Sequence, residues 1–218
     1  PRDYPFGAKR LCVDTGYYET YNRENVSLAD IHSDPIVEMT ADGLLTRRAS
    51  YRFDTLVLAT GFDAMTGALT HIDIRGRNGV LLKEQWRDGP EAYLGVAIAG
   101  FPNVFIITGP GSPSVLANMV LAIEQHVEWI GDLLTHARAN AIEVIEADRQ
   151  EQEKWARAVT ESADRTLYTQ AASWYIGANV PGKPRVFMPY VDGYQVYSRA
   201  CEKIATQGYR GFHLNKAA

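Results

Sequence analysis

The chain has 218 residues, of which 46% are hydrophobic and 22% charged, and its formal net charge is −4. This composition is typical of a globular protein with enough apolar material for a core. The slight acidity argues against a nucleic-acid or anionic-membrane partner, and the longest apolar run, residues 94–101, is too short to span a bilayer. Since Cys12 and Cys201 are the only cysteines, we expect no disulfide framework and a cytoplasmic location.

The first sixty residues predict short elements. Residues 17–21 are expected to form a helical turn and residues 26–31 and 36–40 two strands, with Asp42-Gly43 as a hairpin turn. The apolar run at residues 55–60 ends on Gly61 and predicts a buried strand.

The most informative stretch is residues 109–119, which read GPGSPSVLANM. The apolar run before it, residues 104–108, predicts a buried strand. Ser112 is a candidate N-cap, followed by Pro113 at the first helical position, so a helix is expected from Ser112 to about Ala139. Its apolar stripe would consist of Leu116, Met119, Val120, Ile123, Val127, Ile130 and Leu134. Such a strand–turn–helix leaves N–H groups facing the turn, where an electron-rich ligand edge can bind.

The C-terminal third predicts two further helices and a long loop. Residues 146–165 should form a largely solvated helix with Trp155 and Val159 inward, and residues 194–204 another helix. Residues 173–190, with several prolines and glycines, predict a loop of the length that often carries function. Strands alternating with helices indicate an α/β fold.

The turn by itself is ambiguous, because it reads G-x-G-x-x-S and also fits an ordinary βα turn. Its surroundings are more specific: Gly89-Pro90, YLG at 93–95, AGFPN at 99–103, and IEQHV at 123–127. Together with residues 109–119 they closely resemble type I Baeyer–Villiger monooxygenases, the flavoenzymes that include cyclohexanone and phenylacetone monooxygenase. The ATG at 59–61 resembles the segment that joins the NADP-binding and FAD-binding domains of such flavoproteins.

The resemblance implies the C-terminal portions of two Rossmann-like domains. Residues 1–60 would be the closing part of an NADP-binding domain with a linker. Residues 61–218 would be the closing part of an FAD-binding domain, including a mobile control loop at about 173–190. The chain contains neither G-x-G-x-x-G nor the family fingerprint. We therefore expect a fragment that is inactive alone and whose partner is the N-terminal half of the same enzyme.

The parent enzyme would use NADPH, FAD and O2 to convert a ketone to an ester or lactone through a C4a-peroxyflavin. Two alternatives stay open. One is a flavin monooxygenase that oxidises nitrogen or sulfur, and the other is a non-catalytic, truncated α/β remnant.

By the same resemblance, Lys9 matches a lysine that binds the NADP 2′-phosphate, and Arg10 the active-site arginine, which also contacts the cofactor. A guanidinium stays charged and donates several hydrogen bonds, so it suits an anionic oxygen adduct. The plain alternative is an exposed basic pair.

Ser114, Val115, Leu116 and Met119 match positions that border the ketone pocket, with Met119 touching FAD; the alternative is core packing. Trp174 matches the control-loop tryptophan that hydrogen-bonds NADP, and is otherwise a buried anchor. No metal site is expected, because Glu124, His126 and Glu128 point in different directions from one helix.

Overall fold

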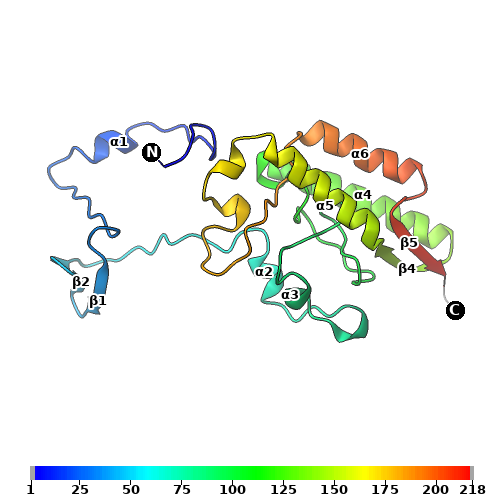
Figure 1. The fold of residues 1–218 in the computed structure, drawn as a ribbon, viewed down its shortest axis with the longest axis horizontal. Helices are drawn as coiled ribbons and strands as arrows, with labels where there is room; N and C mark the ends of the chain where they lie inside the picture. Colours follow the sequence, from blue (N-terminus) through cyan, green and yellow to red (C-terminus); the bar gives the residue numbers. More distant parts are fainter. Residues whose placement is uncertain (1–2, 217–218) are drawn as a thin grey trace. The chain divides into compact units, whose positions relative to one another are not determined.

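The computed structural model describes residues 3–216. Its elements are labelled in Figure 1, and the chain divides into two compact units. One unit is Leu11–Gly61; the other consists of the residues up to Arg10 and those from Phe62 onward. Each unit is described by itself.

The smaller unit is a three-stranded antiparallel sheet preceded by one helical turn, α1 (Tyr17–Thr20). The strands are β1 (Ile36–Thr40), β2 (Gly43–Thr46) and β3 (Ser50–Arg52), in that order across the sheet. Thr40 pairs with Gly43, which confirms the predicted hairpin turn. The predicted helical turn and the strand at 36–40 are confirmed as well.

Two predicted strands of this unit do not form. Residues 26–31 and 55–61 are irregular, and their apolar side chains are exposed, Leu28 by 80%, Val57 by 81% and Leu58 by 74%. A strand forms only where a neighbour completes its backbone hydrogen bonds. Within residues 3–216 neither run has such a neighbour, so the prediction of a buried strand is wrong for this chain.

The larger unit is built on three long helices and a two-stranded sheet. In this sheet β4 (Ile142–Ala147) pairs antiparallel with β5 (Phe212–Lys216), with Ile145 opposite Leu214. Its elements are α2 (Gly67–Thr70), η1 (Arg77–Gly79), α3 (Leu82–Gln85), η2 (Ser114–Leu116), α4 (Met119–Ala139), β4 (Ile142–Ala147), α5 (Arg149–Asp164), η3 (Tyr168–Gln170), η4 (Trp174–Ile176), α6 (Tyr194–Thr206) and β5 (Phe212–Lys216).

The main core lies between the three long helices, β4 and residues 93–99. It contains Trp129 and Leu133 from α4, Ile145 from β4, Val159 from α5 and Tyr197 from α6. The predicted helices within 146–165 and over 194–204 are confirmed as α5 and α6, and Val159 is buried as expected. The strands β4 and β5 were not predicted.

The long central helix starts seven residues later than predicted. Its N-cap is Asn118, whose side chain accepts from the N–H groups of Val120 at 3.0 Å and Leu121 at 3.3 Å. Ser112 is not a cap; its hydroxyl donates to the carbonyl of Gly109 at 2.8 Å. The run before the turn, residues 104–108, makes only an isolated bridge from Phe105 to Ala97, so the strand predicted there is also wrong.

The buried face of α4 differs from the predicted stripe. Of that stripe within the helix, only Ile130 is buried, while Val120, Ile123, Val127 and Leu134 are 39–64% exposed. Because the helix has apolar residues on more than one face, period alone does not decide which face packs. The buried residues of α4 are Ala122, His126, Trp129, Ile130, Leu133 and Ala137.

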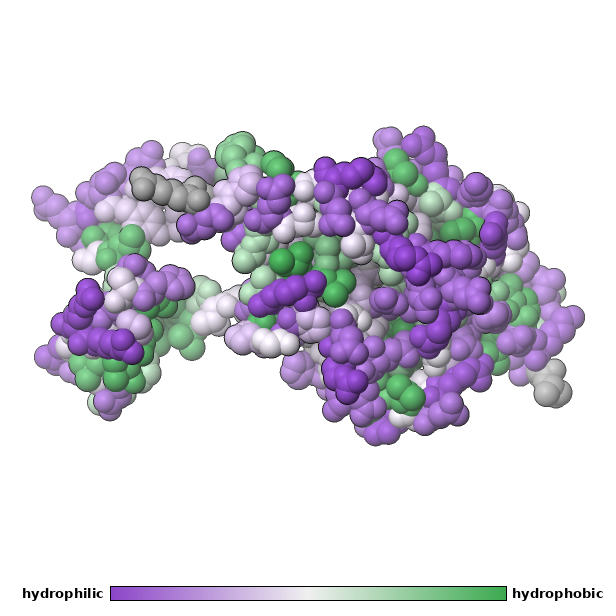
Figure 2. Space-filling model, in the orientation of Figure 1, coloured by the Kyte–Doolittle hydropathy of each residue, from purple (hydrophilic) through white to green (hydrophobic). Residues whose placement is uncertain are grey.

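The surface in Figure 2 is mostly hydrophilic with separate apolar patches. In the part of the chain that the structure describes, no helix combines the length and the apolar character that crossing a membrane requires.

A buried polar relay connects α4 and α6 to two loops. His126, which is fully buried, accepts the Thr108 N–H at Nδ1 (3.0 Å), and its Nε2 lies 2.7 Å from the Tyr197 hydroxyl. That hydroxyl donates to the Leu94 carbonyl at 2.6 Å. Since the tyrosine has one hydrogen to give, Nε2 must carry the histidine proton. The ring is thus neutral, and burial lowers the pKa of His126 to about 4.

We predict that His126 makes the free energy of unfolding fall as the pH is lowered from 6.5 to 4. In this range the unfolded chain, with an ordinary pKa of 6.5, binds a proton that the folded chain refuses. The gap between 6.5 and about 4 corresponds to about 3 kcal/mol. Urea unfolding at several pH values measures the slope. The variant His126→Gln should flatten it and His136→Gln, on the same helix, should not; equal slopes for His126→Gln and wild type would contradict the prediction.

Candidate functional site

The turn at residues 109–113 is held by the protein on several sides. The N–H of Gly109 donates to Gly95 (3.0 Å), that of Gly111 to Met188 (2.7 Å) and that of Ser112 back to Gly109 (3.1 Å). Trp155 Nε1 donates to the Gly111 carbonyl at 2.9 Å. The sequence predicted that N–H groups facing the turn would be open to a ligand; those of Gly109, Gly111 and Ser112 are not, because carbonyl groups of the chain already accept from them.

Glycine is required where two turns cross. Gly95 has φ of +72°, and a Cβ there would lie 2.6 Å from Ser112 Cβ and 2.8 Å from its nitrogen. A Cβ on Gly109 would lie 2.7 Å from the Gly95 carbonyl oxygen. The two backbones therefore approach as closely as they do only because neither residue has a side chain.

Three non-glycine residues beside the crossing have left-handed backbones. They are Leu94 with φ of +56°, Thr108 with +52° and Ser114 with +45°. The relay of His126 and Tyr197 ends on the first two, at the Leu94 carbonyl and the Thr108 N–H. Such backbones persist only where the surroundings hold them, and they gather at functional sites.

Ser114 is the third strained residue and a predicted pocket residue. It is 1% exposed, and its hydroxyl donates to the sulfur of Met65 at 3.1 Å. Met65 also has a positive φ, +69°. The hydrogen bond thus ties the turn to the backbone at Met65.

The structure brings the predicted loop tryptophan to two of the predicted pocket residues. Trp174 packs with Val115 and Leu116 in a small hydrophobic cluster around the buried Tyr175 and Phe187. The rings of Trp174 and Tyr175 are 4.5 Å apart. The hydroxyl of Ser173, next to Trp174, is buried and has no hydrogen-bond partner among the described residues. Residues of the loop at 173–190 and of η2 thus pack against one hydrophobic cluster.

Met119 is the first residue of α4 and is half-buried. Two residues on the same side of the helix, Val120 and Ile123, are 64% and 39% exposed. An apolar face therefore begins at Met119 and continues along the helix, and a flat aromatic ring could lie against it.

Lys9 and Arg10 lie outside the cluster of Trp174, in the N-terminal segment of the same unit. The ammonium of Lys9 stands 4.2 Å from the centre of the Tyr4 ring, a cation–π contact. Arg10 is exposed and is the last residue before the smaller unit, while Ala8, two residues earlier, is fully buried. The segment is thus anchored at Ala8 and presents its two cations beyond it.

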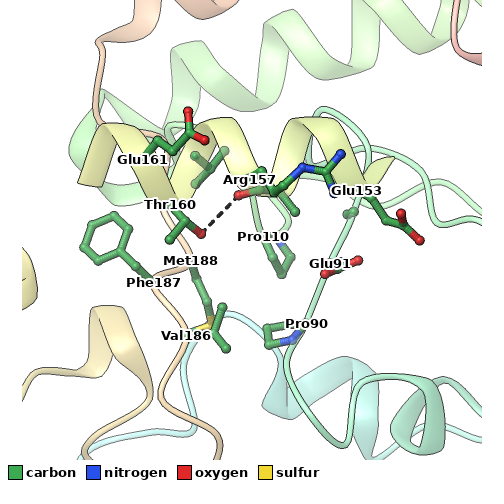
Figure 3. A pocket seen from close by; sticks show the side chains of 14 residues that line it. Pro90, Glu91, Pro110, Glu153, Arg157, Thr160, Glu161, Val186, Phe187 and Met188 are labelled. Carbon is green, nitrogen blue, oxygen red and sulfur yellow. Dashed lines mark hydrogen bonds between the residues drawn. The ribbon is translucent and has the colours of Figure 1, made fainter. Parts of the chain in front are cut away.

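A cavity of about 490 Å³ lies on another side of the turn (Figure 3). Pro110 and Gly111 meet Glu153, Arg157 and Thr160 of α5 there, with the chain at 186–188 opposite. None of the predicted site residues lines it, so it is not the predicted pocket. Within residues 3–216, no three histidine, cysteine or acidic residues are placed to bind a metal ion.

Sequence reasoning missed three residues that support the site: His126, Tyr197 and Met65. His126 had a recognisable signal, since it is the polar residue on a stripe with Ala122 and Trp129 at helical spacing. Met65 and Tyr197 had none, because their partners lie far away in the sequence.

No family model matches the chain. Individual relatives match it over nearly its whole length. Cyclohexanone 1,2-monooxygenase of Acinetobacter sp. is 38% identical over 95% of the chain, and a Baeyer–Villiger monooxygenase of Pseudooceanicola batsensis is 38% identical over 97%. Phenazine N-monooxygenase PhzNO1 of Lysobacter antibioticus is 41% identical over 95%.

Solved structures agree. A steroid monooxygenase bound to NADP superposes with a TM-score of 0.89 at 48% identity, over 100% of this chain. OTEMO in complex with FAD and NADP superposes with a TM-score of 0.92 at 39% identity, over 99%. The chain is homologous to Baeyer–Villiger monooxygenases. It spans about two fifths of their length, 38% of the cyclohexanone enzyme and 41% of the steroid enzyme, as a C-terminal part would.

We predict that Gly95→Ala destabilises the protein by about 2–4 kcal/mol, because the new Cβ meets the Ser112 backbone and φ is positive. The matched control is Gly131→Ala on the exposed side of α4, where a Cβ meets nothing within 4 Å. That change should stabilise by about 0.5–1 kcal/mol. Denaturant unfolding measures both. A neutral Gly95→Ala would mean that the two turns are not packed as described.

Proposed function

We propose that this chain is the C-terminal part of an FAD- and NADPH-dependent Baeyer–Villiger monooxygenase that converts ketones to esters or lactones with O2. The observation that carries the proposal is that Trp174, from the loop at 173–190, packs against the same hydrophobic cluster as Val115 and Leu116 beside the strained turn, in a chain homologous to these enzymes. A cytoplasmic location is part of the same proposal.

The domain assignment is part of the proposal, and the homology supports it. Residues up to about 60 would close the NADP-binding domain, and residues 61–218, with the control loop at about 173–190, the FAD-binding domain. The partner would be the N-terminal half of the same enzyme. Two exposed apolar surfaces support a missing partner. One is residues 56–58, which are 42–81% exposed, and the other is the α4 stripe formed by Val120, Ile123, Val127 and Leu134.

The residues present fit part of each cofactor. The apolar face that begins at Met119 suits the flavin ring, and the unpaired hydroxyl of Ser173 beside Trp174 suits a polar group of a nucleotide. Lys9 suits a phosphate, for which a point charge suffices. The diphosphates need G-x-G-x-x-G turns, and this sequence has none, so the 218 residues should be inactive alone.

When bound, NADPH supplies a hydride and reduced FAD activates O2. The chain's own contribution is charge and shape. Arg10 would hold the negative charge that develops on oxygen during the reaction, through the several N–H donors of its guanidinium. Ser114, Val115, Leu116 and Met119 would border the ketone, and Trp174 would donate its indole N–H to NADP and keep water out.

The second candidate is oxidation of a nitrogen or sulfur atom, favoured by the 41% identity to a phenazine N-monooxygenase. A non-catalytic remnant is the third. The test is to incubate the intact protein that carries this chain with NADPH, FAD and ¹⁸O2, offering cyclic ketones and phenazine. An ester with one ¹⁸O supports the proposal, and N-oxide alone supports the second candidate. Cofactor binding without oxidation of NADPH or of either substrate supports the remnant.

We predict that Arg10→Ala lowers ester formation by about a hundredfold or more, because it removes the charge opposite the developing anion. Flavin reduction by NADPH should change only a few-fold. Stopped-flow absorbance and product analysis separate the two steps. Arg87→Ala, at an exposed arginine of the same unit, is the control. Undiminished ester formation by Arg10→Ala would mean that Lys9 and Arg10 are only an exposed pair of basic residues.

We also predict that Met119→Leu and Ser114→Ala redistribute the products of a ketone panel more than they change NADPH affinity. Met119 is the first residue of the apolar face of α4, and Ser114 has a left-handed backbone immediately before Val115. Leu134→Ala, at the far exposed end of the α4 stripe, serves as the control. Unchanged product ratios in folded variants would mean that both residues serve only in packing and do not border the ketone.

A further inference from the structure

The loop at 173–190 is attached by polar contacts to residues 62–64, the first residues after the smaller unit. Lys183 forms an ion pair with the carboxylate of Asp63, and its ammonium also donates to the Ala64 carbonyl at 3.3 Å. Asn179 Nδ2 donates to the Phe62 carbonyl at 2.7 Å. The loop is thus bound to three consecutive residues, 62–64.

Apolar packing does not make this attachment. A cavity of about 290 Å³ lies between the loop residues 180–184 and Thr66, Thr70, Trp86 and Arg87. Lys183 and Asp63 stand at its border. Side chains that face a cavity lose the dispersion contacts that would otherwise hold the two surfaces together. The charged and amide groups therefore carry the attachment on this side.

Both partners of the ion pair are held in place. The stem of Lys183 lies against Gly177, where a Cβ would be 3.1 Å from Lys183 Cδ, and Asp63 folds onto Gly67, where a Cβ would be 2.7 Å from Asp63 Cβ. The Lys183 side chain is only 12% exposed and that of Asp63 31%. An ammonium covered to this extent needs its counter-charge, because water no longer solvates it.

The other end of the loop is attached by packing. Trp174 and Ile176 pack against the cluster around Tyr175 and Phe187. The Met188 N–H donates to the Tyr175 carbonyl at 2.9 Å. Arg185 donates to the carbonyls of Gly177 and Val180, which joins the two halves of the loop into one piece. Lys183 is connected to Trp174 through Gly177, which lies against the Lys183 stem and whose N–H donates to the Trp174 carbonyl at 3.1 Å.

We propose that Asp63 and Lys183 are positioning residues: they form a polar latch that holds the loop in the position in which Trp174 packs against the same cluster as Val115 and Leu116. Asp63 comes two residues after Gly61, where the smaller unit ends, so the loop is fastened to the first residues of the chain that follow that unit. The latch's consequence for cofactor binding rests on the function proposed above for Trp174. Its effect on the loop does not.

The test is hydrogen exchange of the intact protein that carries this chain, followed by mass spectrometry. In Asp63→Asn, peptides covering 173–186 should exchange about tenfold faster, while peptides from α5 and α6 keep their rates. Lys183→Met keeps the stem on Gly177 and should release the loop as well. The double variant should be no faster than Asp63→Asn, because both changes break one interaction.

The matched control is Asp73→Asn, which removes a carboxylate of the same unit that pairs with Arg75 away from the loop. Unchanged exchange at 173–186 in Asp63→Asn, or an increase spread over α5 and α6, would overturn the latch. Titration with NADP is the second readout, and an about tenfold weaker affinity is expected. Faster local exchange with unchanged NADP affinity would support the latch and contradict the role proposed for Trp174.

Discussion

One neutral histidine determines how the central turn can be built. His126 must be uncharged, because one ring nitrogen accepts from a backbone N–H and the other donates to a tyrosine whose own hydrogen goes to Leu94. This chain of hydrogen bonds has a single consistent direction. Both of its ends are residues with left-handed backbones, Leu94 and Thr108. The crossing of Gly95 with Gly109, and all that follows as far as Met119, depends on those ends staying where they are.

Around this constraint the rest of the site is arranged by packing rather than by further buried charge. Trp174 of the loop at 173–190 packs against the same hydrophobic cluster as Val115 and Leu116 of η2. Polar contacts also hold the loop, among them the ion pair of Asp63 with Lys183 at its margin. A site that is rigid in the turn and releasable in the loop suits chemistry in which a cofactor must enter and water must then be kept out. Fold and proposed function are consistent in this respect.

Much of the helical structure could be predicted from the sequence, and little of the strand structure. α5 and α6 follow from their periodicity, and α4 ends where expected, but it starts at Met119 because Asn118, not Ser112, caps it. Residues 55–61 read as a buried strand, yet pairing depends on neighbours that residues 3–216 do not contain. For the site, Ser114, Val115, Leu116 and Trp174 came from resemblance to a family. The relay joins Leu94, Thr108, His126 and Tyr197 across distant parts of the chain, which local patterns cannot reveal.

The central claim is that His126 is neutral, with its proton on Nε2, and remains so well below the usual range of a histidine. Long-range ¹H–¹⁵N NMR spectra of the chain with ¹⁵N-labelled histidine report the tautomer and its titration directly. We expect a protonated Nε2 and an unprotonated Nδ1 for His126 that persist from pH 7 to about 4.5. A proton on Nδ1, or a His126 that charges near pH 6.5, would contradict the relay and the account of the turn built on it.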